Sequence, residues 1–262
     1  MIHENTLDPL VTVVTVVSNG EEFIEDTILS VINQNYGNLE YIVIDGGSID
    51  RTVEIIKKYE PHIQYWVSEK DSGIYDAMNK GIDVATGEWI TFMNAGDTFS
   101  LNSSIADVFS LDHNSFTVIY GDVSVIYPKF RRLVKAKMIS EISKGMPFCH
   151  QSTFVKASYH KKNMFNVKNP IAADMEFLMA AYRTGVQFNY LPFSISNISS
   201  GGLSDTKRIE TILAWWKVSV ALGSSKNMTL HYVALLSATY LKAMVKRMLP
   251  NVLFLKLLKF IR

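Results

Sequence analysis

The sequence predicts an α/β layer fold with a mostly parallel central sheet flanked by helices. Two observations support this: short β-branched or apolar runs alternate with helical apolar patterns, and short polar loops join them. With 262 residues and 48% apolar side chains, the chain can form one large domain or two small ones around a sizeable core. Neither this apolar fraction nor the 19% of charged residues fits a disordered or fibrous protein.

The first element is a strand at 11–17, because an unbroken β-branched run is typical of a strand buried on both faces. After it, the alternation predicts helices and strands in turn: a helix at 21–34, a strand at 41–44, a helix at 52–59, a strand at 65–67, a helix at 74–85 and a strand at 89–93. This order makes the first hundred residues a parallel α/β unit.

The second half of the chain is more mixed. Two strands are expected at 117–120 and 123–127, around Gly121-Asp122, and a helix is expected at 173–184 with Gly185 as its C-terminal cap. From residue 205 onward the pattern predicts helices at about 205–222 and 229–249, and a short helix after Pro250.

Charge is unevenly distributed along the chain. The net charge of +1 argues against bulk binding of nucleic acid. Residues 1–210 carry 18 basic and 25 acidic side chains, whereas eight basic and no acidic residues follow Glu210. A single cysteine, Cys149, excludes an intramolecular disulfide and a cysteine zinc cluster. Residues 1–10 hold three ionisable side chains and no apolar run, so we expect no signal peptide and a cytosolic protein.

The basic C-terminal region has two interpretations. Its aromatic residues, Trp215-Trp216, Tyr232 and Tyr240, and its leucines are compatible with core packing. Interleaved basic and apolar residues without acids also favour a helix that lies on an anionic membrane surface. The longest uncharged stretch, 227–241, has 15 residues, fewer than the about 20 that a spanning helix needs.

Polar loops follow three predicted strands, at Ser18-Asn19, 45–48 and 94–97, and should meet at one edge of the sheet. Asp45 is either a ligand for a base or ribose or simply part of a turn. Asp97 is either a ligand for Mg²⁺ or Mn²⁺ on a diphosphate or a loop cap. Neither a Gly-x-Gly-x-x-Gly motif nor a Gly-Lys-Ser/Thr phosphate loop occurs, which weighs against a dinucleotide enzyme and a P-loop NTPase.

Further candidates lie in the second half. Asp174 and Glu176 begin a predicted helix, where acids either complement the helix dipole or act as a general base. His150 and Gln151 form a loop pair that is usually structural. Serine hydrolase chemistry is disfavoured because the chain has no Gly-x-Ser-x-Gly elbow.

The order of these segments resembles the inverting family 2 glycosyltransferases, over about residues 11–205. The matching segments are the first strand with Asn19, 41–52 (YIVIDGGSIDRT), 71–81 (DSGIYDAMNKG), 87–97 (GEWITFMNAGD), 148–151 (FCHQ) and 201–204 (GGLS). Segments 71–81, 148–151 and 201–204 are similar to the bacterial surface-polysaccharide branch of that family.

This resemblance implies a GT-A fold over 1–204, with a nucleotide-sugar half at about 11–100 and an acceptor half at about 101–204. The residue pattern and the charge add a helical, basic amphipathic region at 205–262. It implies a nucleotide-diphosphate sugar donor, most typically a UDP-sugar, and a divalent cation, Mn²⁺ or Mg²⁺. By the same resemblance, Asp45 would bind the nucleobase, Asp97 the metal, and Asp174 would be the catalytic base.

Two further sets of residues are assigned on this basis. Contacts to the donor are expected from Asn19, Asp76, Asn79, Lys80 and Asn94. Contacts to the acceptor or to phosphate are expected from His150, Gln151, Glu176 and Gly202. The chain departs from the family pattern where Asn94-Ala95-Gly96-Asp97 replaces the usual Asp-x-Asp-Asp, because only Asp97 retains a carboxylate.

The expected function is inverting transfer of a sugar to a saccharide or lipid-linked saccharide acceptor in surface polysaccharide assembly. The enzyme would lie at the inner face of the plasma membrane. An alternative remains open because segment 94–97 holds only one carboxylate for a metal. In this alternative the protein is a non-catalytic, membrane-associated sugar-nucleotide-binding or scaffold protein. A nucleotidyltransferase is disfavoured, since the Gly-rich basic loop it needs after the first strand is absent.

Overall fold

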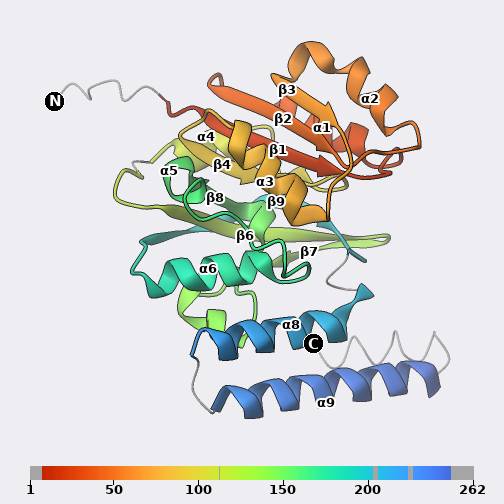
Figure 1. The fold of residues 1–262 in the computed structure, drawn as a ribbon, viewed down its shortest axis with the longest axis vertical. Coiled ribbons are helices and arrows are strands. Elements are labelled where there is room, and N and C mark those ends of the chain that lie inside the picture. Colours follow the sequence, from red (N-terminus) through yellow and green to blue (C-terminus); the bar gives the residue numbers. More distant parts are fainter. Residues whose placement is uncertain (1–7, 112, 203–205, 224–226, 249–262) are drawn as a thin grey trace.

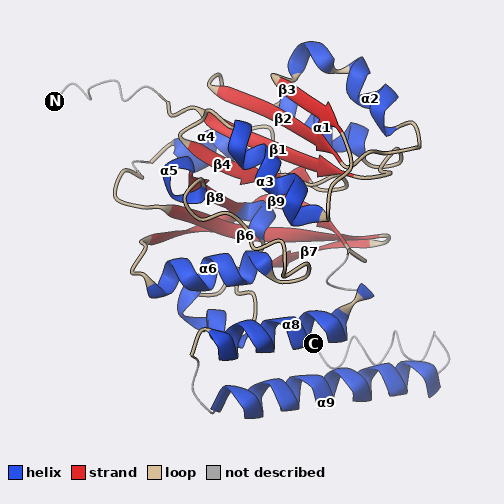
Figure 2. Ribbon diagram, in the orientation of Figure 1, coloured by secondary structure: helices blue, strands red, loops and turns tan. Residues whose placement is uncertain are grey.

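The computed structural model describes residues 8–111, 113–202, 206–223 and 227–248. Over these residues the chain forms one mixed, twisted sheet with helices on both faces, and a pair of helices lies at one end of the molecule (Figures 1 and 2). The strand order is β3-β2-β1-β4-β8-β6-β9-β5, with β7 paired to β6.

The first half matches the predicted alternation. Its elements are β1 (Val11–Val17), α1 (Ile24–Ile32), β2 (Leu39–Asp45), α2 (Thr52–Lys58), β3 (Tyr65–Ser68), α3 (Ile74–Val84) and β4 (Trp89–Phe92). Strands β3, β2, β1 and β4 are parallel, so their carboxyl ends meet at one edge. Every residue of β1 is buried, as expected for a strand covered on both faces.

The second half adds antiparallel strands to this unit. Its elements are β5 (Thr98–Phe99), α4 (Ser104–Phe109), β6 (Val118–Tyr127), β7 (Phe130–Val134), β8 (Thr153–Lys156), α5 (Ala157–His160), α6 (Ala173–Arg183) and β9 (Phe188–Ser199). Strand β8 lies antiparallel between β4 and β6, while β9 runs parallel to β6. The sequence did not predict β8 and β9, and they make the complete sheet mixed.

One prediction in this half is wrong. Residues 117–127 do not form two separate strands, because β6 is continuous over Val118–Tyr127 and includes Gly121-Asp122 as a shift in its register against β9. The carboxylate of Asp122 accepts hydrogen bonds from the Ala136 amide (2.8 Å) and the Tyr190 hydroxyl (2.8 Å). These long-range partners satisfy Asp122 inside the sheet, so its intrinsic preference for a turn is overridden.

Two apolar layers cover the sheet. On one face, Val14 and Ile42 pack with the apolar sides of α3 and α6. On the other, Val13 and Val43 pack with α1, α2 and α4. Full burial of an aliphatic side chain of this size contributes about 1.5–3 kcal/mol, so the alternating faces of β1 and β2 fix the position of the polar loops at their ends.

The helical pair consists of α8 (Arg208–Ala221) and α9 (Asn227–Met248). Tyr232 of α9 is fully buried, stacks on Trp216 of α8 and donates a hydrogen bond to the Ser143 carbonyl (2.9 Å). The core interpretation is therefore confirmed for Tyr232, and the half-buried Trp215 packs against one of the apolar layers, whereas Tyr240 is 54% exposed. The predicted helix after Pro250 lies outside the described residues. Among the helices that are described, none has the length and hydropathy to cross a bilayer.

Candidate active site

A cleft of about 570 Å³ lies between the loop after β4, the start of α6, the end of β9 and α8. Its walls bring together candidates that are far apart in the sequence: Asn94, Asp97, His150, Gln151, Asp174 and Gly202. The candidates from the first half reach the cleft because β4 ends there, as expected for a ligand site beyond the carboxyl ends of parallel strands.

Asp174 stands in the first turn of α6, and its two carboxylate oxygens have different surroundings. Oδ1 accepts hydrogen bonds from the Met175 amide (2.8 Å) and the Tyr75 hydroxyl (3.0 Å). Burial, and then the charge of Asp174, raises the pKa of Tyr75, so this hydroxyl stays protonated and donates. Oδ2 lies 3.4 Å from His150 Nδ1, which leaves Oδ2 with spare capacity to accept a proton.

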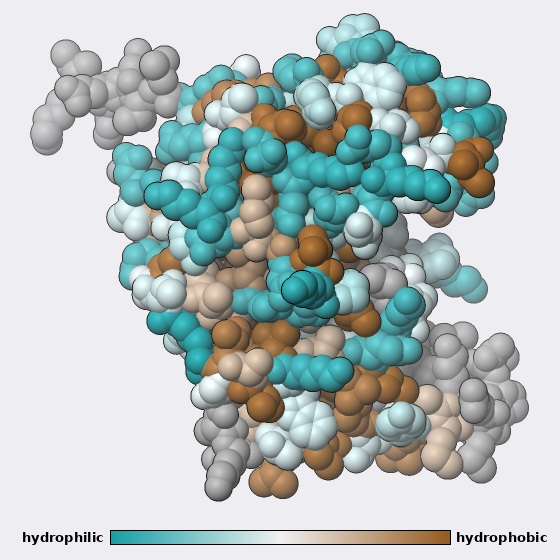
Figure 3. All heavy atoms as spheres, in the orientation of Figure 1, coloured by the Kyte–Doolittle hydropathy of each residue, from teal (hydrophilic) through white to brown (hydrophobic). Residues whose placement is uncertain are grey.

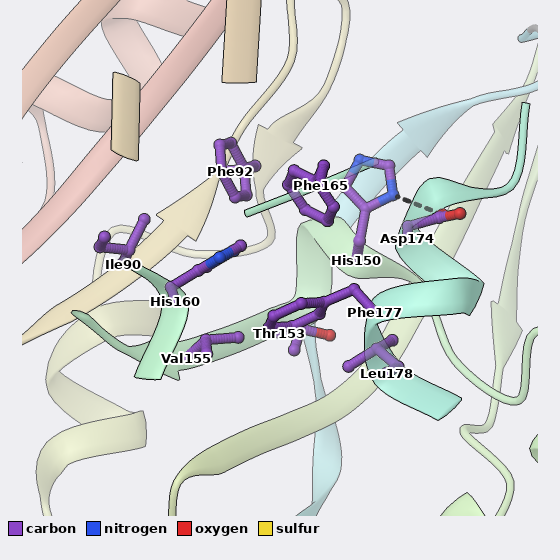
Figure 4. A pocket seen from close by; sticks show the side chains of 10 residues that line it. All are labelled: Ile90, Phe92, His150, Thr153, Val155, His160, Phe165, Asp174, Phe177 and Leu178. Atoms are coloured by element: carbon purple, nitrogen blue, oxygen red, sulfur yellow. Dashed lines mark ion pairs between the residues drawn. The ribbon is translucent and has the colours of Figure 1, made fainter. Parts of the chain in front are cut away.

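His150 connects Asp174 to the loop after β4. Its Nε2 lies 3.1 Å from Asn94 Nδ2, so with the amide donating, the ring carries its proton on Nδ1, toward Asp174. Figure 4 shows His150 and Asp174 pointing toward each other, with Phe165 beside the imidazole. A cavity of about 20 Å³ with mostly apolar walls adjoins the pair. This lining limits the access of water to the dyad from that side.

Asp97 is held by a second chain of contacts. Its Oδ2 accepts a hydrogen bond from Gln151 Nε2 (2.7 Å), and its Oδ1 accepts a longer one from the Ser199 amide (3.4 Å). Gln151 is oriented in turn by the Cys149 thiol, which donates to Oε1 (2.6 Å). Burial raises the pKa of Cys149 to about 12, so it remains a thiol rather than a nucleophile. Burial also raises the pKa of Asp97 to about 6.

The residues available for a divalent cation are few. No group of three His, Cys, Asp or Glu side chains gathers in a metal-binding arrangement within the described ranges. Asp97 is the carboxylate of the 94–97 segment, and the buried Oδ1 of Asn94 has no hydrogen-bond partner within the described part of the chain. Mg²⁺ and Mn²⁺ are often held by one or two carboxylates together with substrate phosphates, and this donor set fits that mode.

Asn19 and Asp45 do not line the cleft but organise the loops beside it. Asn19 has a φ of +50°. Its side-chain Oδ1 accepts a hydrogen bond from the Ile49 backbone amide (3.0 Å), and its backbone amide donates one to Ser48 Oγ (2.7 Å). Asp45 is fully buried and accepts from the Ser48 amide (2.9 Å) and Ser68 Oγ (2.6 Å). A nucleobase would reach Asp45 only by replacing one of these internal donors.

The three candidates on α3 lie outside the cleft. Asp76 accepts a hydrogen bond from the Ser72 amide (2.9 Å) at the start of the helix. Asn79 is used structurally, because its amide both donates to and accepts from the backbone of Phe165 (2.9 Å each). Lys80 is 2.7 Å from Glu69, and this hydrogen-bonded partner raises the pKa of the Lys80 ammonium.

Glu176 is also outside the cleft, although it is two residues from Asp174. Its oxygens accept from the side-chain amides of Asn166 (3.0 Å) and Asn169 (2.8 Å), so it holds the loop before α6. Conversely, the structure adds two residues that were not assigned from the sequence. Tyr75 holds Asp174, and Trp215 of α8 lines the cleft. No spacing rule links them to the site, although the sequence analysis did name Trp215-Trp216 among the aromatic residues of the C-terminal region.

The fold has well-matched relatives among solved structures. It superposes on the S. aureus TarS 1–349 complex with UDP-GlcNAc with a TM-score of 0.66 and 17% identity, over 86% of this chain and 71% of that one. The mannosyltransferase PcManGT from Pyrobaculum calidifontis, solved with GDP-Man and Mn²⁺, gives 0.67 and 18%, over 88% and 70%. At this identity the likeness concerns the fold, and the class is the α/β GT-A glycosyltransferase fold.

The sequence comparisons define the family. The family model described as glycosyl transferase family 2 matches residues 12–186. A PGL/p-HBAD biosynthesis glycosyltransferase of Mycobacterium tuberculosis is 28% identical over 202 residues, 74% of this chain and 78% of that protein. A second, uncharacterized glycosyltransferase from the same species is 33% identical over 183 residues, 67% and 70% of the two chains. The chain therefore belongs to glycosyl transferase family 2.

Proposed function

We propose that this glycosyltransferase moves a sugar from a nucleotide-diphosphate sugar, with a UDP-sugar as the first expected donor, to an acceptor hydroxyl with inversion at the anomeric carbon. The observation that carries the proposal is the pairing of Asp174 with His150 in the cleft that also holds Asp97. A base for the acceptor and a carboxylate for the diphosphate side are the minimum set that such a transfer requires.

In the proposed reaction, the acceptor hydroxyl donates a hydrogen bond to Asp174 Oδ2 and its oxygen attacks the anomeric carbon. The bond from that carbon to the diphosphate oxygen breaks on the opposite face, and the acceptor proton passes to Asp174. A carboxylate is a weak base for an alcohol, so positioning and a late proton transfer must assist. Tyr75 and His150 hold the carboxylate in place for this role.

On the donor side, Asp97 would hold a divalent cation together with the diphosphate oxygens, with Asn94 Oδ1 beside it. A bound Mn²⁺ or Mg²⁺ supplies charge stabilisation to the leaving diphosphate. The loops carrying Asn19 and Asp45 follow neighbouring strands, and we assign them to the nucleoside side of the donor. To contact Asp45, the nucleobase would have to replace the hydrogen bond that Ser48 or Ser68 donates to this carboxylate.

A donor panel tests this proposal. Release of UDP or GDP from several sugar nucleotides is measured with and without Mn²⁺, alongside calorimetric binding of the same donors. We expect one donor class to be turned over and its binding to weaken on addition of EDTA. The single carboxylate at 94–97 favours the alternative of a non-catalytic sugar-nucleotide-binding protein. Binding of a donor without turnover on any saccharide or lipid-linked acceptor would support that alternative.

We also propose that the acceptor is a lipid-linked saccharide and that the protein docks on the inner face of the plasma membrane. Helix α9 supports this with an exposed apolar stripe at helical spacing: Leu230, Val233, Tyr240, Leu241 and Met244. Figure 3 shows apolar residues gathered over the end of the molecule that α8 and α9 form. The absence of acidic residues after Glu210 favours an anionic lipid surface.

Sedimentation with vesicles of anionic and neutral lipid tests the docking. Leu241→Glu/Met244→Glu should abolish most binding, because it places two charges in the stripe. Leu101→Glu/Leu111→Glu is the matched control, since these leucines are each 61% exposed on the α/β domain, against 63% and 59% for Leu241 and Met244. Binding should need anionic lipid and weaken with salt. Equal binding to neutral vesicles, or none to either, would contradict electrostatic docking.

A further inference from the structure

A strongly basic segment lies next to the cleft and has no role in the mechanism above. Residues 123–140 carry five basic and no acidic side chains, within a region 1–210 that has 18 basic and 25 acidic residues. The five cations are Lys129, Arg131, Arg132, Lys135 and Lys137. All five are exposed, and none forms an ion pair within 4.0 Å among the described residues.

The segment is built as a hairpin of β6 and β7, hereafter the basic hairpin (residues 123–137). Strand β7 pairs with β6 alone, and every one of its residues is exposed. The hairpin extends past β8, which pairs with β6 only as far as Tyr120, and β9 runs beside β6 as far as Ile126 (Figure 1). At its tip the rings of Tyr127 and Phe130 stack with centroids 4.5 Å apart, and Phe130 is 54% exposed. An exposed strand of this kind offers both cations and an aromatic surface to a partner.

Strand register connects the basic hairpin to the cleft. Val125 of β6 is the partner of Arg132 on one side and of Ile198 of β9 on the other. Partner residues in a sheet point to the same face, so Arg132, Val125 and Ile198 share one face, and Ile198 lines the cleft. Two strand spacings separate Arg132 from Ile198, about 10 Å. Tyr127 follows Val125 by two residues and pairs with Phe130, so both aromatic residues lie on this same face, nearer the tip of the hairpin.

The backbone after the hairpin also returns to the cleft. The Lys137 amide donates a hydrogen bond to the Pro147 carbonyl (2.8 Å), which places the end of the basic segment beside Met146 and Phe148 of the cleft wall. The Ser200 amide donates to the Ile126 carbonyl (3.0 Å), and Ser200 is itself a lining residue. The hairpin is thus attached to the cleft at two places.

We propose that the basic hairpin binds a negatively charged acceptor saccharide, through phosphate or carboxylate groups on it, and guides it along the shared sheet face into the cleft. The inference rests on the proposed transfer to a saccharide and adds the charge of that acceptor. On the shared face the guanidinium group of Arg132 suits an oxyanion because it donates paired hydrogen bonds, while Arg131 lies on the opposite face of β7 and adds positive charge to the hairpin. The stacked aromatic pair offers an apolar face to a sugar ring. A membrane would be met by the apolar stripe of α9 instead, since β7 alternates cations and apolar residues on both faces.

Fluorescence anisotropy with three labelled oligomers of equal length tests the proposal: an oligogalacturonate, a linear polyphosphate and a neutral malto-oligosaccharide. We expect at least one anionic oligomer to bind and the neutral one not to bind. Arg131→Gln/Arg132→Gln should weaken the anionic complex about tenfold, the scale of losing hydrogen bonds to a charged group. Lys57→Gln/Lys162→Gln removes the same charge from exposed positions elsewhere and should leave affinity nearly unchanged.

The outcomes separate this inference from the proposed function. Preference for the polyphosphate or for the oligogalacturonate identifies which oxyanion the acceptor carries. Equal binding of the neutral oligomer, equal loss in both double variants, or loss of vesicle binding in the arginine variant without any oligomer binding would overturn the proposal. Calorimetric binding of UDP is measured on all three proteins. Its absence from the wild type would count against the proposed function, while the oligomer data would still decide the charge of the acceptor.

Discussion

Asp97 and Asp174 share one cleft but differ in what surrounds their carboxylates. Asp97 meets one short donor, the Gln151 amide, and one long donor, the Ser199 amide, and burial outweighs both to raise its pKa to about 6. Asp174 has two donors on Oδ1 and keeps Oδ2 facing His150. At Asp97, a cation and a proton would compete for the same carboxylate. At Asp174, the free capacity of Oδ2 suits it to accept a proton.

Metal-dependent donor binding should therefore depend on pH through Asp97. Below a pKa of about 6 the protonated form dominates and cannot coordinate a cation, so affinity should fall about tenfold per pH unit below this point and level off above it. Gln151→Leu removes a donor that lowers the pKa, and should move the midpoint to higher pH. Asp97→Ala should abolish the EDTA sensitivity. Calorimetry between pH 5 and 7 that finds constant affinity in the wild type would contradict the assignment.

At the scale of elements, α8 connects the helical pair to the cleft. Trp215 lines the cleft and packs against Gly145, where φ is +128°, while Arg208 lies 5.2 Å from the centre of its ring. The adjacent Trp216 points to α9 and stacks on Tyr232. The two neighbouring tryptophans of α8 therefore have different roles: Trp215 forms part of the cleft wall, and Trp216 contacts α9. The sequence analysis did not distinguish them.

Trp215→Ala should raise the KM for the acceptor about tenfold, because the half-buried aromatic ring in the cleft wall, which we expect to pack on a saccharide ring, is lost. Donor affinity should stay within twofold of the wild type, since the donor loops are on the parallel half of the sheet. Trp216→Ala is the matched control and should lower the Tm through its contact with Tyr232 instead of changing the acceptor KM. Steady-state kinetics, calorimetry and thermal unfolding measure the three quantities. An unchanged acceptor KM in Trp215→Ala would remove this residue from the site.

Local patterns predicted the parallel half well because β1 and β2 are buried on both faces, and such strands appear in the sequence as unbroken apolar and β-branched runs. They failed at β8, whose four residues sit between β4 and β6 and carry no periodicity long enough to detect. They also failed at Gly121-Asp122, where the partners Ala136 and Tyr190 decide the conformation. Strands β8 and β9, which join the sheet by long-range pairing, are therefore part of the fold that the sequence did not predict.

The residues of the candidate site, too, were predicted only in part from the sequence. His150 and Asp174 could be assigned from motif order, and the structure brings them into contact. Asn79 was expected at the donor, yet its amide is used by Phe165, 86 residues away. Tyr75 was not assigned at all, because its partner Asp174 is 99 residues away. Side-chain roles that depend on such distant partners cannot be deduced from spacing along the chain.

For the whole molecule, three surfaces converge on one cleft. The parallel half brings the loops of Asp45 and Asp97 to its edge, the second half brings Asp174 and the basic hairpin, and the helical pair closes it with Trp215. Figure 1 shows these parts stacked along the long axis of the molecule, with α8 and α9 at the end away from α2. In the proposed function, the donor, the acceptor and the membrane would each contact a different one of these parts.

One comparison tests most directly whether Asp174 in this cleft is the base of the proposed sugar transfer. UDP or GDP release is measured for the wild type, Asp174→Asn and Glu176→Gln, with donor affinity by calorimetry and Tm as a check on folding. Because Asp174→Asn keeps the shape but removes the basicity, kcat should fall by about 10²-fold or more while donor affinity is retained. Glu176, two residues away but bound to Asn166 and Asn169, should tolerate its substitution with near-normal turnover. Near-normal turnover in Asp174→Asn, or a comparable loss in a folded Glu176→Gln, would contradict the account.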